Sequence, residues 1–132
     1  MAAVDRPVLK PRPVYLNLFA IRMPFPSVVS FLHRVSGALL FVIGIPLLLY
    51  TVQRSLASPE AWVQMRAAFD TPFAKLVAVV LAWAFIHHLF AGIRHLLLDV
   101  HIGVELAGAR RSAALAFVLA ILVTIAIAVR LW

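Results

Sequence analysis

Residues 73–98 read FAKLVAVVLAWAFIHHLFAGIRHLLL, an apolar run that decides the fold class of this chain. A helix needs about 20 predominantly apolar residues to cross about 30 Å of hydrocarbon, and this run is long enough to do so. Two further runs, at about 28–53 and 112–131, meet the same requirement. The three runs lack the alternation of apolar and polar residues that marks the strands of a membrane barrel. The sequence therefore predicts an all-α membrane protein with three transmembrane helices.

The composition also indicates a membrane protein. The 132 residues are 64% hydrophobic and 13% charged, and a soluble domain of this size lacks the interior to bury that much apolar surface. The net charge is +7, but the basic residues stand singly or in short groups at the ends of the apolar runs, so nucleic acid is not an expected partner. The chain has no cysteine, which excludes thiolate metal sites and iron–sulfur ligation by its own residues.

The distribution of basic residues predicts the orientation in the membrane. Arginines and lysines are concentrated before the first run and after the second. By the positive-inside rule, the N-terminus and the second loop face the cytoplasm and the C-terminus faces the periplasm. We therefore expect a multi-pass protein of the bacterial inner membrane that is surrounded by lipid.

Prolines divide the chain into two parts. Five of the eight prolines fall within residues 1–26, where they disfavour a regular helix and predict an extended arm at the cytoplasmic surface. Residues 27–132 then form one three-helix domain, with the first helix beginning near Ser27. Pro46 predicts a kink in that helix. The stretches SPEAW (58–62) and DTPF (70–73) carry helix start signals, which predict a short interfacial helix over about 59–68 and the start of the second span.

The stretch FLHRVSG (31–37) places His33 and Arg34 where the first apolar run begins. If the hydrocarbon began after Arg34, the run over 37–52 would be only about 16 residues, or roughly 24 Å, which is too short to cross the membrane. Counted over 28–52 it is about 25 residues, or roughly 37 Å. Several polar and small residues share one side of this helix: Ser30, His33, Arg34, Gly37 and Gly44. This arrangement favours a buried polar site over an arginine that merely extends to the headgroups.

The stretch HHLFAGIRHLLLD (87–99) places His88, Gly92, His95 and Asp99 within about 40° of one stripe. His88 lies about 16 Å deeper than Asp99 along a helix, near the middle of the membrane. Two uses of such a histidine stay open at this point. One is a neutral imidazole bonded to a neighbouring helix, and the other is an axial ligand of haem iron, with Gly92 giving the porphyrin room. His87 lies off the stripe and is expected to be a helix-contact or interfacial residue.

Two linked motifs in this sequence resemble those of a known family. SVVSFLHRVSG fits the pattern S-x-x-H-R-x-[ST]-G, and HHLFAGIRHLLLD fits H-x(3)-G-I-R-H-x(3)-D. Both are typical of the cytochrome b large membrane-anchor subunit of succinate dehydrogenase, respiratory complex II. The resemblance runs from Arg12 to about Glu105. It implies that the three helices are half of a heterodimeric helical anchor bundle that binds haem b.

The resemblance also implies roles for individual residues. His88 corresponds to the haem-iron ligand, and a second small anchor subunit supplies the other axial ligand. Ser30 and Arg34 correspond to residues that line the ubiquinone site. His33 lies towards the haem propionates, and His95 and Arg94 are further expected neighbours of those propionates.

Asp99 lies at the depth of Arg34 and is expected to pair with that arginine or to relay protons to the quinone. Glu105 is a weaker candidate for the relay, and its role is left open.

The electrons must come from other subunits, because this chain has neither iron–sulfur ligands nor a nucleotide-binding glycine motif. The expected partners are therefore the small anchor subunit, an iron–sulfur subunit and a flavoprotein subunit. Together they would form a succinate:ubiquinone oxidoreductase, in which this subunit is not a complete enzyme. Two other readings stay open: the anchor of a fumarate reductase that oxidises quinol, and a structural membrane subunit without a redox role.

Overall fold

The computed structural model describes residues 20–132, so most of the predicted proline-rich arm lies outside the described residues. The described part of the chain is helical, with short connections. Its elements are α1 (Phe25–Leu39), the π-helical turn η2 (Leu40–Gly44), α2 (Ile45–Ser55), α3 (Pro59–Phe69), α4 (Pro72–Asp99) and α5 (Leu106–Leu131). Three segments are long and apolar enough to cross a membrane: Phe25–Ser55, Pro72–Asp99 and Leu106–Leu131. The predicted all-α membrane fold with three spans is confirmed.

The helix starts follow the predicted signals. The Ser58 hydroxyl accepts a hydrogen bond from the N–H of Ala61 at 3.1 Å and thereby caps α3. Thr71 caps α4 in the same way through the N–H of Ala74 at 3.4 Å. The start of the first helix was predicted two residues too late. It begins at Phe25, because a proline at the second helical position has no N–H that the first turn needs to satisfy.

The first span contains a π-helical turn directly before Pro46. Proline has no N–H to donate, and its ring collides with the carbonyl four residues earlier in a regular α-helix. That carbonyl belongs to Val42, which lies inside the wider turn over Leu40–Gly44. The irregularity predicted from Pro46 is therefore present as a single π-helical turn.

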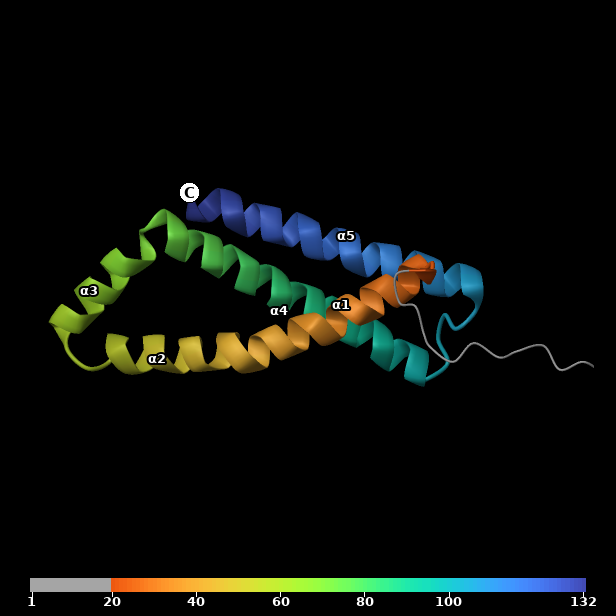
Figure 1. Cartoon of the computed structure of the whole chain (residues 1–132), viewed down its shortest axis with the longest axis horizontal. Helices are drawn as coiled ribbons and strands as arrows, with labels where there is room; N and C mark the ends of the chain where they lie inside the picture. The colour runs from red at the N-terminus through yellow and green to blue at the C-terminus, as the bar shows by residue number, and fades with distance from the viewer. Residues whose placement is uncertain (1–19) are drawn as a thin grey trace, which may run out of the picture.

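The first span diverges from the other two from one end of the molecule to the other. At one end α1 packs against both α4 and α5, and α4 and α5 run side by side along their length (Figure 1). Beyond the π-helical turn, α2 moves away from α4, and the short helix α3 bridges the gap (Figure 1). The buried contact between the three long helices is made by Val29, Ala91 and Ala113, with Phe117 packed against them. Small side chains here let the helix backbones approach closely.

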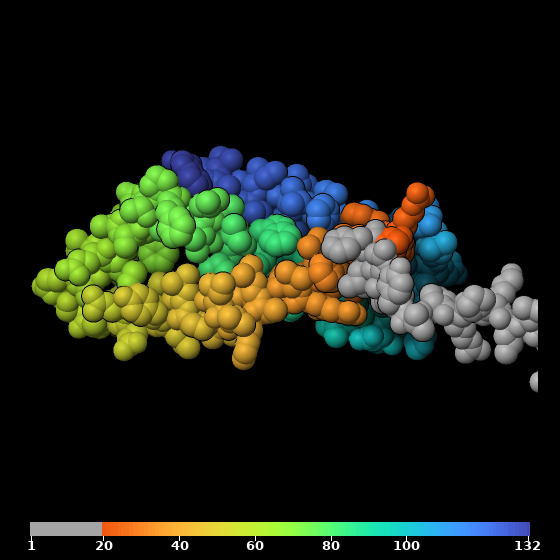
Figure 2. Space-filling view, viewed as in Figure 1, coloured from red at the N-terminus to blue at the C-terminus, as the bar shows by residue number. Residues whose placement is uncertain are grey.

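Most large apolar side chains lie on the outside. Phe41 and Val129 are each 73% exposed, and Leu49 is 63% exposed. In the space-filling view, α2 and α5 lie along opposite long edges of the molecule, with part of α4 between them (Figure 2). Such surfaces are stable only against lipid or against another apolar protein surface.

The loop after α4 reverses the chain through a left-handed residue. His101 has φ 62°, and the N–H of Ile102 donates to the carbonyl of Leu97 at 2.9 Å. This is the hydrogen-bonding pattern of a Schellman motif, in which glycine usually takes the position of His101. Gly103 follows with φ 74°. A Cβ on Gly108, in the first turn of α5, would lie 3.1 Å from the Gly103 carbonyl oxygen, so the loop packs closely on α5.

Candidate functional site

The imidazole of His88 lies where α1 crosses α4. Its ring stacks on that of His33, with centroids 4.1 Å apart and planes inclined by 15°. A Cβ built on Gly37 would lie 2.7 Å from Cε1 of His88, a separation that real side chains do not adopt. Glycine at position 37 therefore makes room for the His88 ring against the backbone of α1. The sequence had assigned a spacing role to Gly92, but a Cβ there would meet Nε2 of His33 at 3.4 Å instead.

The hydrogen bonds of His88 define which ring nitrogen carries the proton. Nδ1 lies 3.0 Å from the main-chain carbonyl oxygen of His33. A carbonyl can only accept, so Nδ1–H donates to it and Nε2 keeps its electron pair. Ligand histidines in metal sites are typically held this way, with one nitrogen donating to a carbonyl and the other free to coordinate. The environment of His88 thus fits an axial ligand of haem iron.

Ser36 is a functional candidate that sequence reasoning did not identify. Its side chain is fully buried, and its hydroxyl lies 3.3 Å from Nδ1 of His88. The same hydroxyl donates to the His33 carbonyl oxygen at 2.9 Å. Ser36 occupies the [ST] position of the motif S-x-x-H-R-x-[ST]-G, but the pattern alone does not show that its hydroxyl faces the second helix.

A row of histidines extends from His88 towards the end of α4. His95 lies next to His33, with ring centroids 5.1 Å apart and planes inclined by 45°. The structure therefore brings together the three histidines that the two motifs supplied separately. His33 belongs to α1, whereas His88 and His95 lie two turns apart on α4.

The predicted quinone-site residues lie at the same end of the molecule. Ser30 is half-buried on α1, Arg34 is exposed one turn later, and Asp99 is exposed at the last position of α4. Within residues 20–132 the structure contains a single ion pair, Lys75 with Asp70 at 2.9 Å, so Arg34 and Asp99 are not paired there. Lys75 also holds the pKa of the Asp70 carboxyl below its usual value, mainly by donating a hydrogen bond to it.

Arg94 faces α5 and is only 6% exposed. Its Nε donates to the Ser112 hydroxyl at 3.2 Å, and Nη2 donates to the Ala109 carbonyl at 3.5 Å. These contacts favour a role in packing α4 against α5. These contacts do not support the predicted position of Arg94 beside the haem propionates.

His87 and His88 point to different sides of α4. His87 is fully buried and stacks on Trp83, with ring centroids 5.4 Å apart. Its ring also meets Phe117 of α5 edge-on, at a centroid distance of 6.1 Å. His87 therefore makes the helix contact expected of it, and His88 is the histidine that faces open space.

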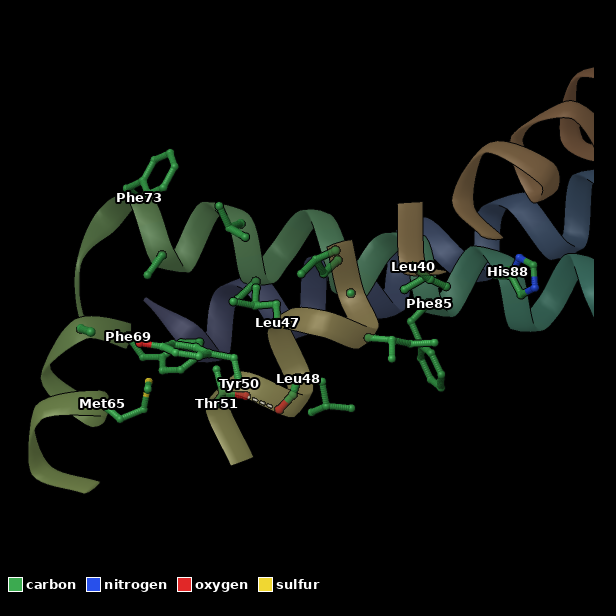
Figure 3. A pocket seen from close by; sticks show the side chains of 17 residues that line it. Leu40, Leu47, Leu48, Tyr50, Thr51, Met65, Phe69, Phe73, Phe85 and His88 are labelled. Atoms are coloured by element: carbon green, nitrogen blue, oxygen red, sulfur yellow. Dashed lines mark hydrogen bonds between the residues drawn. The ribbon is translucent and has the colours of Figure 1, made fainter. Parts of the chain in front are cut away.

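That open space is an apolar pocket between α2, α3 and α4, with a volume of about 750 Å³. His88 lies at one end of the pocket, and Met65 and Phe69 of α3 lie at the other (Figure 3). Among the polar lining residues, Thr51 uses its hydroxyl to bond the Leu48 carbonyl of its own helix at 2.8 Å. The imidazole thus borders a cavity with almost no competing polar groups.

The fold and the site define a helical integral membrane protein with a histidine at one end of an apolar pocket. Residues 8–127 match the family described as succinate dehydrogenase/fumarate reductase transmembrane subunit. The chain belongs to this family and is a transmembrane cytochrome b subunit of the succinate dehydrogenase/fumarate reductase type.

Two relatives have the same subunit name. The succinate dehydrogenase cytochrome b556 subunit of Coxiella burnetii (strain RSA 493 / Nine Mile phase I) is 33% identical over 122 residues, which cover 92% of this chain and 97% of the relative. The subunit of that name from Paracoccus denitrificans is 30% identical over 101 residues, which cover 76% of this chain and 77% of the relative. The family predicted from the two motifs is confirmed.

Proposed function

We propose that this chain is the large membrane anchor of a succinate:ubiquinone oxidoreductase, in which it binds haem b and forms part of the ubiquinone-reduction site. The observation that carries the proposal is the orientation of His88. Its Nδ1 donates to the His33 carbonyl at 3.0 Å, which leaves the electron pair of Nε2 uncommitted, and the residue lines one end of an apolar pocket. The names of both relatives favour succinate oxidation over the reverse, fumarate-reducing direction.

In this proposal His88 would hold the haem iron from this chain, and the second, small anchor subunit would provide the other ligand. Haem b bound there would supply a one-electron redox centre. His33 and His95 lie on the side of His88 towards the end of α4, where they can donate hydrogen bonds to the propionates. The chain's own contribution is to bind and orient the group and to keep water away from it.

Ser30 and Arg34 would bind the quinone head at the cytoplasmic edge of the membrane. A hydroxyl and a guanidinium both donate hydrogen bonds to quinone carbonyl oxygens, and the cation stabilises negative charge as it develops there. Because Arg34 and Asp99 are exposed in this chain, another subunit must cover them, and the iron–sulfur subunit docked on the cytoplasmic side suits that role. Asp99 would then deliver protons from the cytoplasm.

The orientation that suits this chemistry has the N-terminus and the α4–α5 loop in the cytoplasm and the C-terminus in the periplasm. Electrons would enter from succinate through the flavoprotein and iron–sulfur subunits, which form the water-soluble part of the complex. This subunit anchors them in the bacterial inner membrane.

One experiment on the purified complex tests the haem and quinone roles separately. We expect His88→Ala to remove the b-type bands from the reduced-minus-oxidised absorption spectrum. We expect Arg34→Lys to keep those bands and to keep succinate oxidation by an artificial dye acceptor, but to lower ubiquinone reduction by at least tenfold, because an ammonium cannot reproduce the geometry of a guanidinium fork.

Unchanged bands in the His88→Ala complex would refute the ligand assignment. Equal loss of dye reduction and quinone reduction in Arg34→Lys would instead indicate an assembly role for Arg34. A wild-type complex with no b-type bands at all would favour a structural membrane subunit.

A further inference from the structure

The His88 ring has a polar neighbour in addition to the His33 carbonyl. The Ser36 hydroxyl lies 3.3 Å from Nδ1 and is fully buried between α1 and α4. A buried hydroxyl in an apolar helix contact is costly unless it is hydrogen-bonded. Ser36 meets this requirement through the His33 carbonyl at 2.9 Å, so its proximity to His88 is not needed to satisfy its own donor.

We propose that Ser36 is a positioning residue that, together with the His33 carbonyl, fixes the tautomer and orientation of His88. This inference rests on the proposed role of His88 as a haem ligand.

The directions of the hydrogen bonds follow from the three atoms. Because the Ser36 hydroxyl donates its hydrogen to the His33 carbonyl, its oxygen is left as an acceptor facing Nδ1. Nδ1–H therefore lies between two acceptors, at 3.0 Å and 3.3 Å. The alternative tautomer would place the Nδ1 electron pair against a carbonyl oxygen at 3.0 Å, which is repulsive. Both contacts thus hold the proton on Nδ1 and the electron pair on Nε2.

The same contacts affect the electron-donating strength of Nε2. Acceptors that draw on the Nδ1 proton raise the basicity of the opposite ring nitrogen. A more basic ligand favours the ferric state of iron over the ferrous state, because the ferric ion has the higher charge. Ser36 should therefore lower the midpoint potential of the haem relative to a site in which only the carbonyl accepts.

The test is a redox titration of the haem in the full complex, followed through its b-type absorbance. Ser36→Ala is expected to keep the bands but to raise the midpoint potential, with the ferric-to-ferrous ratio falling by up to about tenfold, or about 59 mV for a one-electron couple. Ser36→Thr should restore the wild-type value, because a threonine hydroxyl in a helix makes the same bond to a carbonyl one turn back.

A matched control removes a similar hydroxyl elsewhere. Thr124 on α5 is buried and donates to the Ala120 carbonyl of its own helix at 2.7 Å, and within residues 20–132 it has no hydrogen bond to a histidine. Thr124→Val should leave the midpoint potential unchanged. If Ser36→Ala does not assemble, Ser36→Cys serves in its place, since a thiol has nearly the same size but is a weaker acceptor.

The inference would be overturned if the haem midpoint potential of Ser36→Ala equals the wild-type value. The same holds for Ser36→Cys where that variant replaces Ser36→Ala. A shift that Ser36→Thr shares would also overturn the inference, because disturbed packing at position 36 and not loss of the hydroxyl would then be responsible. In both cases the loss of bands in His88→Ala would still support the proposed function. Bands that survive His88→Ala would refute the proposed function itself, whatever the Ser36 variants show.

Discussion

Gly37 is important because it has no Cβ. The ring of His88 occupies the position where a side chain at residue 37 would begin, with only 2.7 Å between Cε1 and a Cβ built there. Main-chain atoms of α1 cannot move out of the way as a flexible side chain can. The absence of a side chain at Gly37 therefore allows both the close approach of α1 to α4 and the observed position of the His88 ring.

We expect Gly37→Ala to displace the His88 ring or to separate α1 from α4, at a cost of about 1 to 3 kcal/mol, as for other overpacked interiors. The complex should retain less haem, measured as b-type absorbance per mole of flavin. Gly44→Ala is the control on the same span, because its nearest neighbour is the flexible Leu40 side chain at 3.3 Å. Equal haem loss in both variants would show that the ring contact has no special importance.

At the scale of the helices, the short interfacial helix depends on its first residues. Ser58 caps α3 through the N–H of Ala61, and Glu60 adds a negative charge to the first turn, where the helix dipole is positive. The side chain of Trp62 is 53% exposed on this helix. Tryptophan is typical of the membrane–water interface, because its apolar ring can contact lipid while its N–H bonds to water.

We expect Ser58→Ala to destabilise the first turn of α3 by about 1 kcal/mol. Hydrogen–deuterium exchange of the amides at the start of α3 should then accelerate by about fivefold. Ser58→Asp keeps a capping acceptor and should exchange at nearly the wild-type rate. Unchanged exchange in Ser58→Ala would mean that neighbouring contacts, and not the cap, hold this turn.

The helices themselves could largely be predicted from the sequence, because each signal acts locally. Apolar runs gave the three spans, and the serine and threonine before a proline gave the starts of α3 and α4. The turn at His101 could not be predicted, because its left-handed conformation is more typical of glycine and is stabilised here by hydrogen bonds back to α4. The contact of Ser36 with His88 was also missed, because it depends on how two distant helices cross.

At the scale of the whole molecule, the pocket between α2, α3 and α4 indicates that this chain holds only part of the proposed haem site. The described residues contain no group of three or more metal-ligating side chains, and His88 is the only histidine that lines the pocket. A single imidazole can provide one axial ligand. In the proposed function, a second chain supplies the other ligand and covers the apolar walls.

We therefore expect the chain expressed alone to insert into membranes without developing the b-type spectrum of the complex. Co-expression with the small anchor subunit should restore those bands, and replacing His88 with alanine in the co-expressed pair should abolish them again. Reduced-minus-oxidised spectra of the membranes provide the measurement. Full b-type bands from the chain alone would contradict the shared-site arrangement.

The π-helical turn over Leu40–Gly44 also decides where the first span can change its length. A turn of this kind accommodates one residue more than an α-helical turn does. Deleting one residue within it would therefore keep the faces of α1 and α2 where they are, but the Pro46 ring would then meet the carbonyl four residues earlier. Deleting a residue elsewhere in the span would rotate every later side chain by about 100°. Loss of one residue in this turn is thus tolerated only together with a replacement of Pro46, and the histidine contact before the turn then keeps its place.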